Sequence, residues 1–206
     1  MCKGKFLGIL IDSHLTWKEH VNNICFKISR VIGVLNRLKS ILPLQILVNL
    51  YNTMILPYLT YCNIIWGNCA SYLLQRLFLL QKRAIRVITK SFYLAHTDQL
   101  FYKLKILKIH DLYRLQVASF MFSYSKNILP EHFNEFFVLN SSVNNYSTRN
   151  SNKLYIPFYR YNFSRTLVRY QGPITWNNLS NELKCCHTLQ CFKRNYKMTL
   201  INAIPH

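Results

Sequence analysis

Apolar side chains recur every three or four residues along most of the chain, a spacing typical of amphipathic helices. The clearest such segment runs from Leu73 to Lys90. Its apolar positions fall on one side of a helix: Leu73, Leu74, Leu77, Leu80, Ala84, Ile85 and Ile88. Its basic positions fall largely on the other side: Arg76, Lys82, Arg83, Arg86 and Lys90. No acidic residue interrupts the basic side, so we expect this helix to bury one face and offer the other to a negatively charged partner.

Two further helices are predicted upstream of this segment. Thr16 and Glu19 have the spacing of a capping box, which would start a helix that continues to Leu42. Pro43 ends that helix and is expected in the first turn of the next one. Because the second helix is apolar nearly all round, it is predicted to lie centrally. Pro57 is expected to break or kink it.

The first residues have the pattern of a strand rather than a helix. Residues 5–12 are apolar and β-branched and are bounded by Gly4 and by Asp12-Ser13. They are therefore predicted to form one strand, for which the chain offers no evident partner. We interpret Asp12 and Asp111 as turn and cap residues.

Downstream of the basic helix, Thr97 is expected to cap a short helix and Asp111 to begin one that ends near Ser125. Three lysines lie between these helices and form a second basic cluster: Lys103, Lys105 and Lys108. Residues 140–152 are rich in Ser and Asn and are predicted to be a linker. Beyond it, residues 154–161 and 166–170 are predicted to pair as short strands. Gly172-Pro173 would then turn the chain before a last amphipathic helix over 189–201.

The charge balance points to a polyanionic partner. Lys and Arg number 26 against 7 Asp and Glu, a formal charge of +19. Such a domain repels itself, and nucleic acid is the usual partner of so basic a surface. Half of the residues are hydrophobic, which is enough to build a core.

Seven cysteines without a regular framework, together with no recognisable signal peptide, favour an intracellular protein with reduced thiols. Residues 41–66 are too polar for a membrane span, so no membrane association is expected.

Catalytic patterns are weak in this sequence. No two of its seven acidic residues are adjacent, and it has no glycine-rich phosphate loop and no HExxH pair. Cys185-Cys186-His187 with Cys191 is the metal candidate, but adjacent cysteines do not readily bind one ion, so a loop with incidental thiols is favoured. Tyrosines and arginines interleave over residues 155–170. That pattern suits base stacking with phosphate contacts, and equally a surface that packs on helices.

Several short pieces carry a family resemblance. They are Phe6-Leu7-Gly8 with Asp12, Leu15 and Trp17; Tyr58-Leu59 through Trp66-Gly67; Leu80 through Ile88; Tyr146-Ser147-Thr148-Arg149; and Gly172, Trp176-Asn177 and Leu179. In this order the chain resembles the C-terminal part of reverse transcriptases from non-LTR retrotransposons of the jockey-like group. The resemblance runs almost from end to end.

The resemblance implies a mainly α fold in four parts. Residues 1–14 would be a β-hairpin remnant from the end of the palm, and 15–138 a helical thumb-like domain. Residues 139–152 would be the linker, and 153–206 a small α+β C-terminal extension. The family's aromatic-Asp-Asp polymerase motif does not occur in these 206 residues. The resemblance therefore implies a fragment without fingers and most of the palm, inactive by itself, with no cofactor of its own, whereas the full-length enzyme uses Mg²⁺.

We therefore expect sequence-tolerant binding of RNA, DNA or an RNA–DNA hybrid through phosphates. The expected contacts are Arg76, Lys82, Arg83, Arg86 and Lys90, with Lys103, Lys105, Lys108, Arg149 and Arg165 as accessory residues. About five neutralised phosphates would give log affinity against log salt a slope of about −4 to −5. Two other interpretations remain open. In the first, the chain is a basic helical module that docks an acidic protein. In the second, it is a decayed reading frame without a function.

Overall fold

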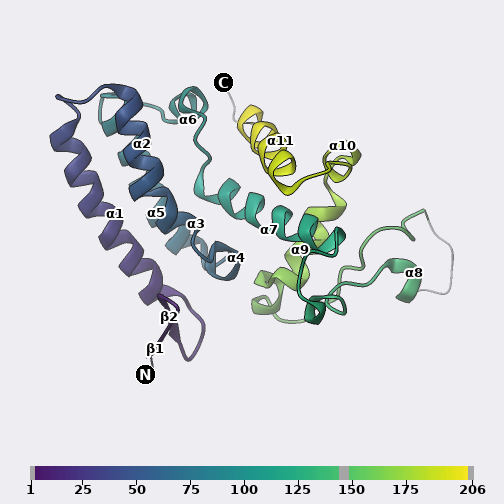
Figure 1. The fold of residues 1–206 in the computed structure, drawn as a ribbon. Coiled ribbons are helices and arrows are strands. Elements are labelled where there is room, and N and C mark those ends of the chain that lie inside the picture. Colours follow the sequence, from purple (N-terminus) through teal and green to yellow (C-terminus); the bar gives the residue numbers. More distant parts are fainter. Residues whose placement is uncertain (1–2, 144–148, 204–206) are drawn as a thin grey trace. The chain divides into compact units, whose positions relative to one another are not determined.

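Helices dominate the computed structural model, which describes residues 3–143 and 149–203 (Figure 1). One short antiparallel hairpin near the N-terminus accompanies them. The mainly α prediction is therefore confirmed. The chain divides into two units, one of Met1–Tyr113 with Leu200–His206 and the other of Arg114–Thr199. The division falls within a helix and not at the Ser/Asn-rich segment.

The first unit begins with a hairpin of β1 (Lys3–Phe6) and β2 (Ile9–Asp12), in which Phe6 lies opposite Ile9. The turn consists of Leu7 and Gly8, with φ of 44° and 84°. Two positive φ angles in succession suit the tight turns that match the twist of a hairpin. The single strand predicted from the residue pattern was wrong, because Gly8 lets the apolar run fold back and pair with the residues before it. The short hairpin implied by the family resemblance is confirmed.

Asp12 braces the start of α1 (Lys18–Leu38). Its carboxylate accepts hydrogen bonds from the Thr16 N–H at 3.1 Å, the Thr16 hydroxyl at 2.8 Å and the Trp17 N–H at 3.2 Å. Burial raises the pKa of this carboxyl, but the hydrogen bonds from Thr16 and Trp17 outweigh burial and leave the pKa lowered. The interpretation of Asp12 as a turn residue is confirmed, since its carbonyl also accepts the Leu15 N–H at 3.0 Å, but the residue that caps α1 is Trp17. The capping box was wrong, since the N-cap is Trp17 and its side chain makes no cap hydrogen bond.

Three helices follow α1: α2 (Leu44–Met54), α3 (Leu56–Thr60) and α4 (Asn63–Trp66). Pro43 is the N-cap of α2, just outside its first turn, and Pro57 lies in the first turn of α3, so the expected break is confirmed. The central position predicted for the second helix was wrong. Only Leu47 and Tyr51 of α2 are buried, and its other large apolar side chains are partly or largely exposed.

Gly67 directly follows α4 at a place with no room for a side chain. A Cβ there would lie 2.5 Å from the Asn63 carbonyl oxygen and 2.7 Å from the ring of Tyr113. The absent side chain lets the end of α4 approach the start of a later helix within the first unit.

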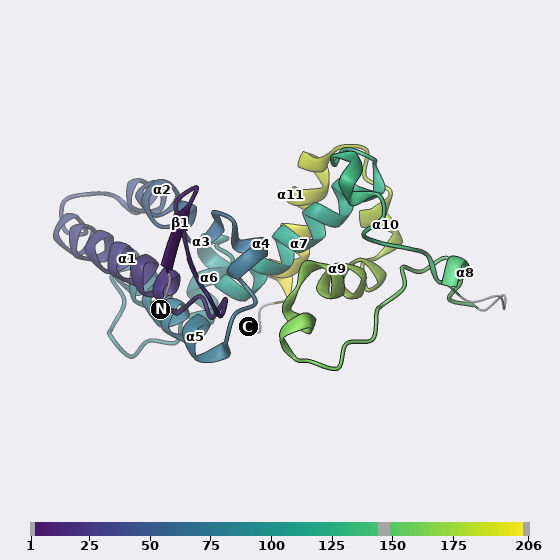
Figure 2. The same cartoon turned by 90° about the horizontal axis from the view of Figure 1, so that it is seen from below.

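The basic helix is α5 (Ser71–Ile88), and it packs along α1 and also against α2 (Figures 1 and 2). Its apolar face is buried as predicted, apart from Leu80, which is half-buried. Next come α6 (Asp98–Leu104) and α7 (Ile109–Ser125), whose residues up to Tyr113 belong to the first unit. Both helices were predicted.

The second unit continues α7 and adds shorter elements: η1 (Glu131–Phe133), α8 (Asn140–Val143), η2 (Phe163–Thr166), α9 (Val168–Asn177), α10 (Asn181–Lys184) and α11 (Leu189–Asn202). Its core includes Met121, Phe122, Phe137, Leu154 and Phe192. The rings of Phe122 and Phe192 stack at 4.7 Å between centroids, so α7 and α11 share this core. The last predicted helix is confirmed.

The strands predicted over 154–161 and 166–170 were wrong. Leu154 makes one isolated bridge to Leu139, and the second stretch lies in η2 and α9. The predicted turn at Gly172-Pro173 was also wrong, because both residues are buried inside α9. A Cβ on Gly172 would lie 2.6 Å from the Met121 sulfur and 3.2 Å from the Phe137 ring. This glycine allows close helix packing instead of a turn.

His20 is a buried histidine with incomplete hydrogen bonding. Its Nδ1 accepts the Leu10 N–H at 3.4 Å, and its ring meets Trp66 edge to face at 5.5 Å. Its Nε2 is buried and has no hydrogen-bond partner among the described residues. Burial, followed by the positive charge of Lys27, lowers the pKa of His20.

We expect His20 to make the fold acid-sensitive. As the pH is lowered through about 6.5, the unfolded chain takes up a proton at this position while the folded chain does not. The free energy of unfolding therefore decreases as the pH is lowered, until the pH reaches the lowered pKa of the folded state. Urea titrations from pH 7.5 to 5 on His20→Leu should show a weaker decline than on the parent chain. His96→Gln, which alters an exposed histidine, serves as the control and should keep the parent's decline. Equal declines in all three proteins would contradict the prediction.

Candidate nucleic-acid interface

An open groove of about 920 Å³ runs between α1 and α5 within the first unit. From α1 and the residue after it, the lining is Cys25, Ser29, Ile32, Gly33, Asn36 and Lys39. From α5 it is Arg76, Leu79, Leu80, Arg83, Arg86 and Val87, and the next turn adds Ser91, Phe92 and Tyr93. We call this site the α1–α5 groove.

Small side chains on α1 create the space for the groove. Ser29, Gly33 and Asn36 follow one another at helical spacing on the side that faces it. A Cβ built on Gly33 would meet no atom within 4 Å, so this position is open to solvent. The wall from α5 is formed by long basic and branched apolar side chains.

Three predicted arginines line the groove, and two of them are hydrogen-bonded to other residues of the first unit. The Arg76 guanidinium donates to the Asn22 side-chain oxygen at 2.7 Å, and Arg86 Nε donates to the Ala95 carbonyl at 3.0 Å. Arg83 lies between them and is exposed. Because a guanidinium has five N–H groups, each tethered arginine keeps donors for a ligand.

The groove contains four cations and no carboxylate. Lys39 adds its ammonium to the three arginines, and none of the lining residues is acidic. A concave surface with one sign of charge concentrates its field and attracts the opposite charge. Cys25 also lines the groove. Burial raises the pKa of its thiol, and nearby Arg76 opposes that rise, so the thiol stays protonated at neutral pH.

The other two basic residues predicted on this helix lie outside the groove lining. The Lys82 ammonium is 4.5 Å from the centroid of the Phe78 ring, a cation–π contact. Lys90 follows the end of α5 with a left-handed backbone, φ 53°, and is exposed. The structure therefore gathers three of the five predicted contacts in one place and adds Lys39.

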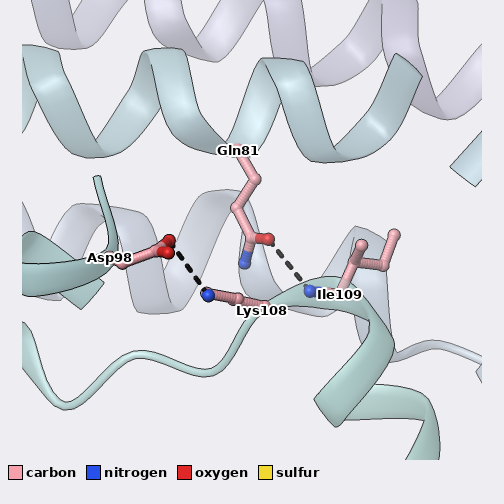
Figure 3. Close-up of polar contacts among 4 residues, drawn as sticks. All are labelled: Gln81, Asp98, Lys108 and Ile109. Atoms are coloured by element: carbon pink, nitrogen blue, oxygen red, sulfur yellow. Dashed lines mark hydrogen bonds and ion pairs between the residues drawn. The ribbon is translucent and has the colours of Figure 1, made fainter. Parts of the chain in front are cut away.

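The lysine cluster, with Lys103 in the last turn of α6 and Lys105 and Lys108 in the segment before α7, is not uniformly available to a polyanion. Lys103 and Lys105 are exposed. The Lys108 ammonium lies 3.0 Å from the Asp98 carboxylate, so its charge is already compensated (Figure 3).

Arg149 and Arg165 belong to the second unit and are not part of the α1–α5 groove. The Arg165 guanidinium donates to the Tyr159 carbonyl at 3.2 and 3.3 Å. Arg149 is exposed, and Tyr146-Ser147-Thr148 before it lie outside the described residues. Some of the interleaved aromatic and basic residues pack within this unit, as shown by Arg169 over the Phe136 ring at 5.7 Å.

The sequence analysis did not identify Gln81, whose hydrogen bonds join α5 to α2 and to the segment that leads into α7. Its side chain is fully buried, and Nε2 donates to the Tyr51 hydroxyl and to the Leu107 carbonyl, each at 2.8 Å. Its Oε1 accepts the Ile109 N–H at 3.0 Å (Figure 3). A signal was present, because position 81 lies four residues from both Leu77 and Ile85 and so falls on the buried side.

Across residues 3–143 and 149–203, no three His, Cys, Asp or Glu side chains gather as a metal site would require. The sulfurs of Cys186 and Cys191 both lie near the Asn195 side-chain amide, at 3.7 and 3.6 Å. No helix in the described part of the chain combines the length and apolar character needed to cross a membrane.

Comparison with protein-family models, curated proteins and solved structures finds no match to this chain.

We expect Gln81→Leu to destabilise the first unit by about 3 kcal/mol, because it leaves the buried Leu107 carbonyl and Ile109 N–H without their partner. Gln75→Leu changes an exposed glutamine on the same helix and should shift stability by less than about 0.5 kcal/mol. Urea unfolding followed by circular dichroism measures both. Similar losses in the two variants would show that the hydrogen bonds of Gln81 are not important for stability.

Proposed function

We propose that the first unit binds the phosphates of nucleic acid without sequence preference, as a thumb-like region related to non-LTR retrotransposon reverse transcriptases. The observation that carries this proposal is the α1–α5 groove, with Lys39, Arg76, Arg83 and Arg86 and no acidic lining residue. Phosphate contacts from Arg and Lys position a protein on nucleic acid but carry no direct sequence information. The expected ligand is the template–primer, as RNA, DNA or hybrid.

The resemblance supports the proposal at specific positions. Gly8 makes the hairpin turn, Asp12 braces the start of α1, and Gly67 occupies a place without room for a side chain. Gln81 fills the buried side of α5. These are residues of the family pattern, and each has a structural role that a change of residue type would disturb.

Binding, rather than polymerisation, is the proposed role of this chain by itself. The aromatic-Asp-Asp motif of the family does not occur among its 206 residues. In the full-length family enzymes the Mg²⁺-dependent chemistry belongs to the palm, and the thumb holds the template–primer. The basic groove fits the second task.

A second candidate is a module that docks an acidic protein. It is favoured by the shape of the site, because a groove between two helices with apolar walls also suits an amphipathic helix. Ile32, Leu80 and Val87 supply such walls. This candidate predicts that nucleic acid competes poorly with an acidic helical peptide.

The test of the proposed function is a salt titration of duplex binding. Four groove cations correspond to a slope of about −3.6 for log affinity against log salt. The magnitude of this slope is smaller than that of the slope of about −4 to −5 expected from the sequence for about five phosphates. Arg83→Ala with Arg86→Ala should reduce the magnitude of this slope by about 1.8. Fluorescence anisotropy with a labelled duplex from 50 to 300 mM salt measures it.

The matched control removes the same charge from the same unit. Arg30→Ala with Arg37→Ala changes two exposed arginines of α1 that do not line the groove. It should leave the slope nearly unchanged. A slope near zero for the parent chain, or equal losses in the two double variants, would refute a phosphate site in the groove.

A further inference from the structure

Three consecutive large apolar side chains, two of which line the groove, are largely exposed. Phe92 and Tyr93 are each 76% exposed and Leu94 is 71% exposed. They lie shortly after α5, which ends at Ile88, and the two rings also line the groove. Turns normally carry small or polar residues, so three large apolar ones together indicate a contact surface. We call Phe92–Ala95 the aromatic turn.

The aromatic turn is built onto the groove's own arginine. The Ala95 N–H donates to the Phe92 carbonyl at 3.0 Å, which closes the turn. The Ala95 carbonyl accepts Arg86 Nε at 3.0 Å, and the Ser91 N–H donates to the Arg86 carbonyl at 3.0 Å. Arg86 is thus bonded to the backbone on both sides of the turn, so the segment that carries the two rings is held next to the guanidinium.

We propose that the α1–α5 groove takes a single-stranded segment of nucleic acid, whose phosphates lie on the arginines and whose bases stack on Phe92 and Tyr93. This inference rests on the proposed function and narrows it. In a duplex the base faces are stacked inside, so a duplex can offer the groove only its phosphates. Unpaired bases instead gain free energy by stacking on exposed aromatic rings.

The dimensions and lining of the groove agree with a short single strand. Arg76 and Arg86 are ten residues apart on α5, about 15 Å along the helix axis. That length corresponds to the small end of single-strand sites, about four nucleotides. Between the cations the lining includes the apolar side chains of Ile32, Leu80 and Val87, which suit bases better than a second phosphate backbone. Ser29 and Asn36 add polar groups that can bond to base edges.

The experiment compares fluorescein-labelled 12-mers of oligo(dT) and oligo(rU) with a labelled 12-base-pair duplex, using the full chain and anisotropy. We expect the parent chain to bind the single strands more tightly. Phe92→Ala and Tyr93→Ala should each weaken single-strand binding by about fivefold or more and leave duplex binding nearly unchanged. Tyr93→Trp should retain binding and show fluorescence quenching when oligo(dT) is added.

Two controls separate the aromatic effect from folding and from charge. Phe6→Ala with Phe26→Ala removes two rings of the first unit, 65% and 62% exposed, that do not line the groove, and should leave single-strand binding unchanged. Gly33→Glu places a carboxylate in the groove where a Cβ meets nothing within 4 Å. It should weaken single strands and duplex alike. Circular dichroism melts verify that each variant is folded.

The outcomes distinguish the proposed phosphate-binding function from the single-strand inference. Salt-dependent binding that does not distinguish single strand from duplex and ignores Phe92→Ala and Tyr93→Ala would overturn the single-strand inference and leave the proposed function standing. Failure of both nucleic acids to bind, together with tight binding of an acidic amphipathic peptide that Gly33→Glu abolishes, would overturn both. Loss of single-strand binding in the aromatic variants alone supports both.

Discussion

The buried amide of Gln81 determines the rotation of α5 in the first unit. A glutamine side chain carried into the core must find partners for both its donor and its acceptor, since an unpaired buried polar group costs about 1 to 3 kcal/mol. The Tyr51 hydroxyl and the backbone at Leu107 and Ile109 supply those partners. Rotating α5 by one residue would break every one of these bonds. The inward side is therefore fixed, and the arginines on the opposite arc face outward.

The groove results from the fixed orientation of α5 and from the short side chains on the facing side of α1. The helices pack along each other, yet Ser29, Gly33 and Asn36 leave the outer part of the seam unfilled. Arginines then extend over that space, and two are tethered to Asn22 and to the Ala95 carbonyl. With 26 basic and 7 acidic residues, the chain has few carboxylates to neutralise them. These like charges therefore repel one another across the groove.

Three glycines of the chain are needed for backbone conformation or for close packing, and not for chemical reactivity. Gly8 supplies a left-handed turn, while Gly67 and Gly172 let neighbouring segments approach where a Cβ would be too close. Gly172 shows how composition misleads, because a Gly-Pro pair normally marks a turn and here lies inside α9. Tertiary packing against Met121 and Phe137 outweighs the local preference.

The sequence alone determined the longer helices (α1, α2, α5, α7 and α11) and the basic side of α5, because helical periodicity is a local property that eighteen residues display by themselves. It did not determine α9, which lies where a strand and a turn were predicted. It also identified Arg76, Arg83 and Arg86, which do line the groove. The tertiary structure decided the rest: the addition of Lys39, the compensation of Lys108 by Asp98, the hairpin pairing and the burial of Gln81. These depend on partners far away in the chain, 54 residues for Arg76 and Asn22 and 30 for Gln81 and Tyr51. No local pattern encodes such contacts, since they exist only once the chain has packed.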